Sequence, residues 1–251
     1  MRITRVVAAA ATIAVAASAV AVAQTTTTEF KVGGSVTVTG GTKAKPKPGG
    51  LSFRFDVSDP SGNQTPPVQT YAIMYEGGRL NTGLLPACKA DKLNAMTTPN
   101  PSACPSGSKI GAGKLTALIG SAGQPTSTAS PCQASLALYA SGKGHAMLFV
   151  SSKLGECPVA LSQAIDMQYV TKGEYAGLKF TVPELLRHQV GLDITVTHAE
   201  VSLSKIVKTV KGKKVGYIES TGCKDGQRDM TVTFTDETGA AFPAQANLGK
   251  C

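Results

Sequence analysis

The sequence contains no tryptophan, and aromatic residues make up only 5% of its 251 residues. Proteins that hold sugars on a surface usually stack them on aromatic rings, so this scarcity argues against a lectin-like face without excluding one. Acidic residues are also few. The 16 Asp and Glu against 25 Lys and Arg give a formal net charge of +9, and such a balance keeps a protein soluble and favours anionic neighbours.

Motifs that carry well-known chemistry are missing from the sequence. It has no HExxH zinc motif, no GxSxG nucleophile turn, no EF-hand loop and no CxxC pair. The tract from Ser108 to Leu115 contains glycines and a lysine, but its spacing does not fit a phosphate-binding loop. Gly111 and Gly113 are instead expected to mark a bulge or a close backbone approach in a strand. We expect no metal and no cofactor.

Histidines are equally scarce. His145, His188 and His198 are far apart in the sequence, and none has a His or Cys neighbour at the spacing of metal ligands. A Ser–His–Asp triad is a spatial arrangement that a sequence does not reveal, and His198 would be its candidate base. Glu184 and Asp193, on either side of His188, are a candidate glycosidase pair. The sequence itself assigns no catalytic residue.

The first 23 residues have the pattern of a cleavable signal peptide. Arg2 and Arg5 precede an apolar run from Val6 to Ala23, which ends in small residues before Gln24. The arginines hold the start of such a run on the cytoplasmic side of the membrane. The run of about 18 residues also reaches the lower limit for a retained anchor, but weakly hydrophobic alanine dominates it. We therefore predict export, with no transmembrane span in the mature chain, to a secreted or cell-wall-associated location.

Six cysteines follow this leader. Their number is even, no two form a CxxC pair, and the predicted compartment is oxidising, so three disulfides are expected. Six cysteines allow 15 connectivities. Closing each loop would stabilise the fold by about 3 kcal/mol. We expect sequential pairing, because each such pair flanks one loop or hairpin: Cys88–Cys104, Cys132–Cys157 and Cys223–Cys251.

Short runs of alternating apolar and polar residues dominate the mature chain. The clearest is Leu51–Val57, which places Leu, Phe, Phe and Val on one face, and Val68–Tyr75 is a second long strand. A single helical turn is expected at Pro183–His188, because proline suits the first position of a helix. Further strands are expected at residues 35–39, 109–119, 133–139, 145–150, 165–170, 178–182, 192–203, 205–210, 215–219, 230–234 and 240–244.

This pattern of about ten to twelve short strands, with little helical periodicity, predicts an all-β fold. We expect an antiparallel β-sandwich or two packed β-lobes, stapled by disulfides. Residues 24–34 are expected to form a flexible, Thr-rich start, and residues 35–251 the β region. A subdivision near residues 153–163 would separate the two lobes.

The sharpest positive feature is a basic hairpin around a glycine turn. Such a tip would meet an anionic cell-wall polymer or lipid headgroups through its charge, and we expect no nucleic acid as a partner. The alternative is a solvated hairpin whose lysines discourage edge-to-edge aggregation. The basic residues are Lys205, Lys208, Lys211, Lys213 and Lys214.

Two blocks of the sequence resemble a known group of proteins. The first comprises Leu85–Cys88 and Ala103–Gly113, and the second runs from Gly222 through Phe234 to Cys251. They resemble uncharacterised exported, cysteine-containing β-sandwich proteins of high-GC actinobacteria. The shared features are cysteines, prolines and glycines. The resemblance therefore implies export, disulfides and a β architecture, but no activity and no catalytic residues.

Three classes of function remain open. The leading hypothesis is a secreted or cell-surface, non-enzymatic β-domain with a structural or binding role. The alternatives are an extracellular hydrolase acting on wall polymer or lipid, and a carrier of an apolar small molecule or lipid. An enzyme requires a histidine within hydrogen-bond reach of both a hydroxyl and an acid. A carrier requires an apolar cavity, roughly several hundred Å³ for a drug-sized ligand.

Overall fold

The protein is described by a computed structural model that covers residues 28–94 and 103–251. The predicted signal peptide lies outside the described residues. Nearly all regular structure is β, which confirms the all-β class. The short helical segments are α1 (Ala90–Asn94), η2 (Thr126–Thr128) and η3 (Glu184–Leu186).

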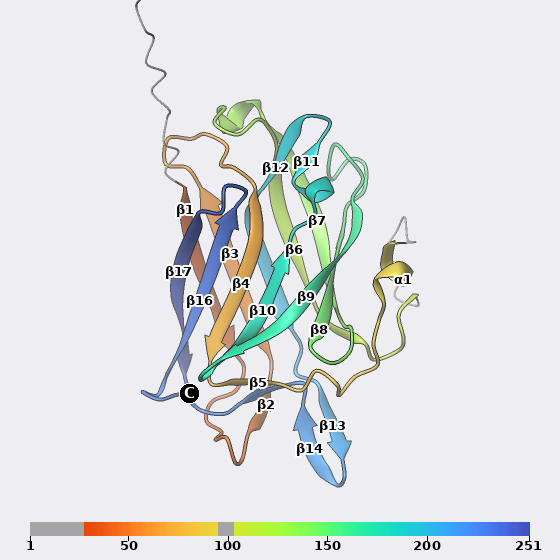
Figure 1. Ribbon diagram of the computed structural model, residues 1–251, viewed down its shortest axis with the longest axis vertical. Coiled ribbons are helices and arrows are strands. Elements are labelled where there is room, and N and C mark those ends of the chain that lie inside the picture. The colour runs from red at the N-terminus through yellow and green to blue at the C-terminus, as the bar shows by residue number, and fades with distance from the viewer. Residues whose placement is uncertain (1–27, 95–102) are drawn as a thin grey trace, which may run out of the picture.

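One antiparallel sheet of 12 strands forms the body of the molecule (Figure 1). Its strand order is β1-β3-β12-β6-β7-β8-β9-β10-β4-β16-β17, with β11 beside β12. The strands are β1 (Glu29–Val36), β3 (Leu51–Ser58), β4 (Val68–Glu76), β6 (Lys109–Gly120), β7 (Ser130–Ala140), β8 (His145–Ser151), β9 (Ser162–Lys172), β10 (Tyr175–Thr181), β11 (His188–Gln189), β12 (Leu192–Leu203), β16 (Gln227–Asp236) and β17 (Ala241–Lys250).

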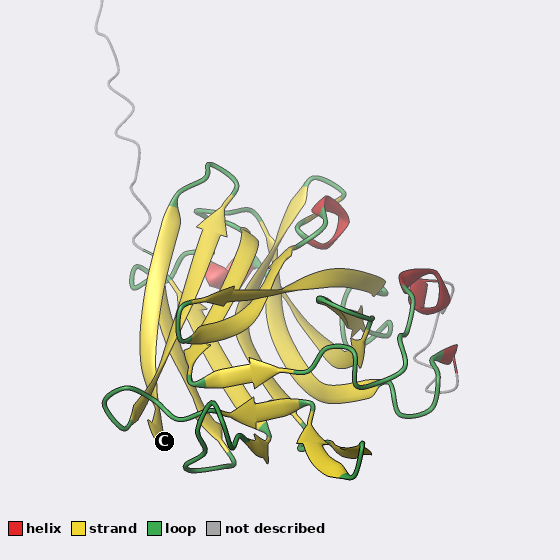
Figure 2. Ribbon diagram, turned by 60° about the horizontal axis from the view of Figure 1, so that its bottom comes forward, coloured by secondary structure: helices red, strands yellow, loops and turns green. Residues whose placement is uncertain are grey.

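This sheet curls until its two ends meet around a shared interior (Figure 2). Phe30 of β1 stacks on Phe242 of β17, with ring centroids 5.4 Å apart. Phe55 of β3 and Tyr71 of β4 lie on strands far apart in the sheet order, yet their ring centroids are 5.5 Å apart. Opposite parts of the sheet therefore pack face to face, as the two layers of a sandwich do.

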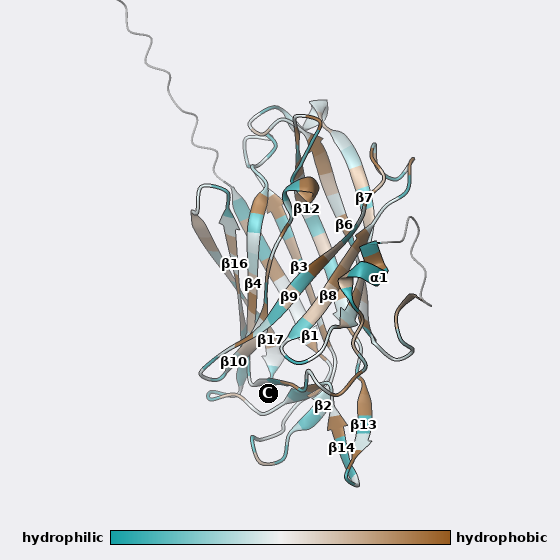
Figure 3. Cartoon of the chain, turned by 45° about the vertical axis from the view of Figure 1, so that its right-hand side comes forward, coloured by the Kyte–Doolittle hydropathy of each residue, from teal (hydrophilic) through white to brown (hydrophobic). Residues whose placement is uncertain are grey.

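The alternation read from the sequence decides which face each strand buries. In β3, Leu51, Phe53, Phe55 and Val57 are all buried, and the residues between them are more exposed. Figure 3 shows the same alternation of hydrophobic and hydrophilic residues along other strands. A period of two is expected for strands with one face on the core.

A separate three-stranded sheet lies across the lower end of the curled sheet, as oriented in Figure 1. It consists of β2 (Lys47–Gly49), β15 (Ile218–Ser220) and β5 (Gly78–Leu80), with β15 in the centre. Its anchor is the buried Glu219, whose Oε2 accepts hydrogen bonds from Arg79 Nη2 at 2.6 Å and from Asn81 Nδ2 at 2.8 Å. This end of the interior is therefore covered by the backbone of the small sheet, with the Glu219 carboxylate held by hydrogen bonds.

Glu219 should make the stability of the protein depend on pH. Burial raises the pKa of its carboxyl, but hydrogen bonds from the Gly216 N–H, Asn81 and Arg79 outweigh burial and hold it below the ordinary value of 4.5. Because the folded-state pKa is the lower one, this stabilisation is present above the unfolded-state pKa and is lost as the pH falls through the folded-state pKa.

We expect Glu219→Gln to lower the free energy of unfolding by about 1–3 kcal/mol at pH 7. The difference from wild type should shrink as the pH falls below 4.5. Urea denaturation between pH 7 and pH 3 measures it. Glu174→Gln is the control, because Glu174 forms only an exposed pair with Lys43. Parallel pH profiles for wild type and Glu219→Gln would contradict this role.

Three disulfides staple the fold, and they indicate that the chain folds in an oxidising environment. The first fixes the segment that carries α1, the second ties β7 to the loop after β8, and the third holds the last residue. The bonds join the sequential pairs, with Cα–Cα distances of 5.1, 4.1 and 5.7 Å: Cys88–Cys104, Cys132–Cys157 and Cys223–Cys251.

The start of the β region differs from the sequence prediction. Strand β1 begins at Glu29, not Ser35, so most of the stretch expected to be a flexible start is part of the sheet. Gly34 packs so closely on the Ser52 carbonyl that a Cβ would collide there. Glycine therefore allows this close approach of two strands.

The segment at residues 153–163 does not divide the chain. Strand β8 ends at Ser151 and β9 begins at Ser162, within the segment, and these two residues pair directly. The segment is a long loop within one sheet, held by the disulfide at Cys157. Gly111 and Gly113 do mark close backbone approaches, since a Cβ on either would meet a carbonyl of β12.

Candidate functional site

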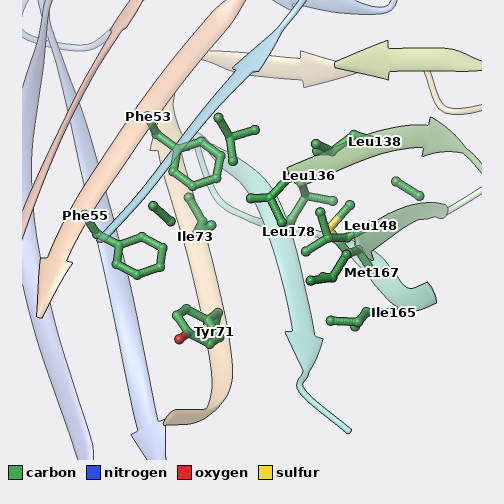
Figure 4. Close-up of a cluster of buried hydrophobic side chains, with 14 of the residues drawn as sticks. Phe53, Phe55, Tyr71, Ile73, Leu136, Leu138, Leu148, Ile165, Met167 and Leu178 are labelled. Atoms are coloured by element: carbon green, nitrogen blue, oxygen red, sulfur yellow. The ribbon is translucent and has the colours of Figure 1, made fainter. Parts of the chain in front are cut away.

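An apolar cavity of about 90 Å³ lies inside the curled sheet. Its walls are Leu, Ile, Val, Phe, Ala and Met side chains together with Tyr71, and no charged residue lines it. Figure 4 shows side chains of β3, β4, β7, β8, β9 and β10 pointing into this interior. A ring of strands that turn their apolar faces inward therefore builds the cavity.

Leaving this space empty is unfavourable. Protein interiors are packed at the density of organic crystals, and a void costs about 24 cal/mol per Å³, or about 2 kcal/mol here. Water does not fill such a space well, because a buried water needs two to four polar partners. Among the described residues that line the cavity, Tyr71 alone carries a polar side-chain group, and burial raises the pKa of its hydroxyl. The cavity therefore suits an apolar occupant.

The two ends of the interior differ. At the lower end Tyr75, Tyr169 and Tyr217 are packed beneath the three-stranded sheet, and the hydroxyls of Tyr169 and Tyr217 hydrogen-bond to each other. At the upper end the cover is the short η3 turn, whose buried Leu186 lines the cavity. Phe180 of β10, which also lines the cavity, stays partly exposed. The wall of the cavity therefore reaches the surface beside Phe180.

A charged network holds this upper cover in place. Arg187 forms an ion pair with Glu237 in the turn between β16 and β17. His188 places Nε2 2.6 Å from Oε1 of Glu237 and Nδ1 2.9 Å from Oδ1 of Asp193. The network thus connects the segment after η3 to two other parts of the sheet.

The other histidines also contact acids. His145 Nδ1 lies 3.0 Å from Oδ2 of Asp166, and His198 Nδ1 lies 2.7 Å from Oδ1 of Asp56. In the described part of the chain, the hydrogen bonds give none of the three histidines a Ser or Thr hydroxyl. Asp193, one of the candidate glycosidase carboxylates, accepts the Ala122 N–H as well as contacting His188. Residues 28–94 and 103–251 contain no group of three potential metal ligands.

The predicted basic hairpin is present as a projecting ribbon at the lower end (Figure 1). Strands β13 (Val207–Val210) and β14 (Lys213–Gly216) pair only with each other. Lysines 208, 211, 213 and 214 are exposed on it, with Lys205 exposed at its base. Among the described residues, none of the five forms an ion pair with an acid. Their binding to an anionic surface stays a prediction.

Comparisons with protein-family models, with curated proteins and with solved structures found no match. None of the helices in the described ranges is long and apolar enough to cross a membrane. Fold and site together define a class: an all-β protein whose curled antiparallel sheet encloses an apolar cavity.

The cavity residues were not predicted from the sequence. The available signal was small residues at inward positions of long strands, such as Ala117 and Ala199.

Proposed function

We propose that this protein binds an apolar small molecule in the interior of its curled sheet, and that it does so outside the cytoplasm. The observation that carries the proposal is the cavity of about 90 Å³ with no charged residue in its lining. Engineered cavities of roughly 150 Å³ with similar walls stay dry and bind benzene. At about 90 Å³ the cavity of this protein is smaller, so the ligand would be a single small uncharged ring or the end of an acyl chain.

Binding would rest on exclusion of water rather than on directed hydrogen bonds. Each Å² of apolar surface removed from water contributes about 25 cal/mol. The occupant would also recover the packing contacts that the void forgoes. The leader-like sequence and the three disulfides support a secreted location. This proposal develops the binding role expected from the sequence. The cavity of about 90 Å³ is smaller than the roughly several hundred Å³ that a carrier of drug-sized ligands requires, so the proposal is for a smaller apolar molecule or the end of an acyl chain.

The test is a ligand series measured by thermal unfolding and calorimetry. Benzene and the 1-alkanols from hexanol to dodecanol should raise the melting temperature in a concentration-dependent way, since a ligand at 100 times its Kd stabilises by about 2.7 kcal/mol. Alkylammonium ions of equal length are the control, because a charged group in this cavity would find no partner. If no apolar member stabilises the protein, the proposal fails.

The projecting ribbon favours a second function, attachment to an anionic surface. Four lysines without acidic partners lie within a few residues of its turn, so their positive electrostatic potentials add at the end of the ribbon. The combined change Lys211→Glu, Lys213→Glu and Lys214→Glu should abolish binding to anionic vesicles or to wall polymer at low salt. Co-sedimentation measures this binding.

A matched control reverses three other exposed lysines, on the outer face of the sheet: Lys109, Lys114 and Lys179. Both variants change the net charge equally. Only the ribbon variant should lose binding, because the lysines that it reverses lie close together at the end of the ribbon. Equal retention of the two variants on anionic vesicles would contradict a dedicated role for the ribbon.

A further inference from the structure

An exposed apolar tip lies at the upper end of the sheet, beside the cover of the cavity. Strands β11 and β12 form a short hairpin in which Gln189 pairs with Leu192, so that Val190 and Gly191 form its turn. Val190 is 94% exposed. Leu192 is 40% exposed and Leu185, on η3, is 59% exposed. These three residues, Leu185, Val190 and Leu192, form the apolar tip.

The valine at this turn is an unfavourable choice for stability. The φ angles of Val190 and Gly191 are 54° and 76°, and a two-residue turn with both φ values positive favours Asn or Gly. A β-branched residue in the left-handed region is a genuine outlier. Because its side chain is almost fully exposed, packing does not offset this cost. Backbone strain of this kind is typical of functional positions.

The apolar tip is continuous with the cavity cover. Leu185 points to solvent and the next residue, Leu186, lines the cavity. Four ionisable side chains at the base of the tip are engaged with one another, while Glu184 beside Leu185 is exposed. Arg187 pairs with Glu237, and His188 contacts both Glu237 and Asp193. Because these charges are already paired, the apolar tip can contact a partner without burying an unpaired charge of this network.

We propose that the apolar tip inserts into the surface of a zwitterionic lipid bilayer and brings the upper end of the cavity against it. A convex turn with one protruding valine fits a deformable lipid surface better than a flat protein interface. The exposed acid Glu184 beside Leu185 disfavours anionic headgroups. The purpose of this contact, exchange of an apolar ligand with the membrane, rests on the proposed function. The contact itself does not.

The experiment measures flotation of the protein with phosphatidylcholine vesicles, without any added ligand. Val190→Asn suits the positive φ at this position, so it should keep or raise the melting temperature and yet weaken vesicle binding at least tenfold. Val210→Asn is the matched control. Val210 is also an exposed valine, 42% exposed, and it lies on β13 at the opposite end of the molecule. It should leave binding to zwitterionic vesicles unchanged.

Each result separates the alternatives. A stable Val190→Asn variant that binds vesicles as wild type does would overturn the proposal. So would absent binding of the wild type, or a Val190-dependent dimer on size-exclusion chromatography, which would assign the tip to a second copy of the chain. Vesicle binding without alkanol binding in solution would refute the cavity function and leave the tip's role intact. Alkanol binding without vesicle binding would refute the role of the apolar tip and leave the cavity function intact.

Discussion

Replacing Phe234 by alanine should lower the free energy of unfolding by about 3–5 kcal/mol. Phe234 is completely buried on β16. Its ring stacks on Phe30 with centroids 4.3 Å apart and meets Phe55 and Tyr71 edge-on. It thus links β1 and β3, at one end of the strand order, to β4 and β16 near the other end. Its removal creates a cavity and also ends three aromatic contacts.

Chemical denaturation measures this loss, and Phe242→Ala is the matched control. Phe242 lies opposite Phe234 on the edge strand β17, but it is only partly buried and has one aromatic neighbour, Phe30. We expect its replacement to cost clearly less. If the two variants were equally stable, the closure of the sheet would not depend on the aromatic cluster around Phe234.

Filling the cavity should abolish ligand binding. Ala117 is fully buried on β6 and lines the cavity. The leucine side chain in Ala117→Leu would occupy space that the ligand needs, so the affinity for benzene and for the alkanols should fall at least a hundredfold. Because the added side chain enters existing empty space, stability should change little. Calorimetric titration and thermal unfolding measure the two effects.

Ala146→Leu makes the same substitution outside this cavity. Ala146 is fully buried on β8 and does not line the cavity. Overpacking there should cost about 1–3 kcal/mol while ligand affinity is retained. Undiminished alkanol binding by Ala117→Leu would contradict the cavity as the binding site, and so would equal destabilisation by the two substitutions.

The strands were the most predictable part of the fold, because a period of two is written directly into the residues. Strand β12 has the predicted bounds Leu192–Leu203, and β3 differs by one residue. The single helical turn after Pro183 is present as η3. The start of β1 was missed, because Gly33 and Gly34 carry no side-chain pattern and serve the sheet through close backbone approach.

The site was less predictable, since a cavity is a property of volumes that meet across the fold. Nothing local marks Ala117 on β6 and Ala199 on β12 as neighbours of one empty space. The basic ribbon was visible because its lysines are close in sequence. The network of Arg187, His188 and Glu237 was not, because Glu237 comes from a distant turn.

These features combine into the arrangement that we propose for ligand binding. The three-stranded sheet closes the lower end, the aromatic cluster holds the curled sheet together, and a short turn covers the upper end. An apolar ligand would enter beneath Leu186, close to the apolar tip. The lysines lie at the opposite end, so attachment through the ribbon and exchange through the tip would use different surfaces (Figure 1).

The most direct test of the cavity function is a crystal structure of the protein soaked with bromobenzene, in which anomalous scattering locates the bromine. We predict one strong peak inside the curled sheet, among Tyr71, Ala117 and Ile194 of the cavity wall. The same soak of Ala117→Leu should show no peak there. An empty interior in the wild type, or bromine only at surface positions, would contradict a ligand-binding role for this cavity.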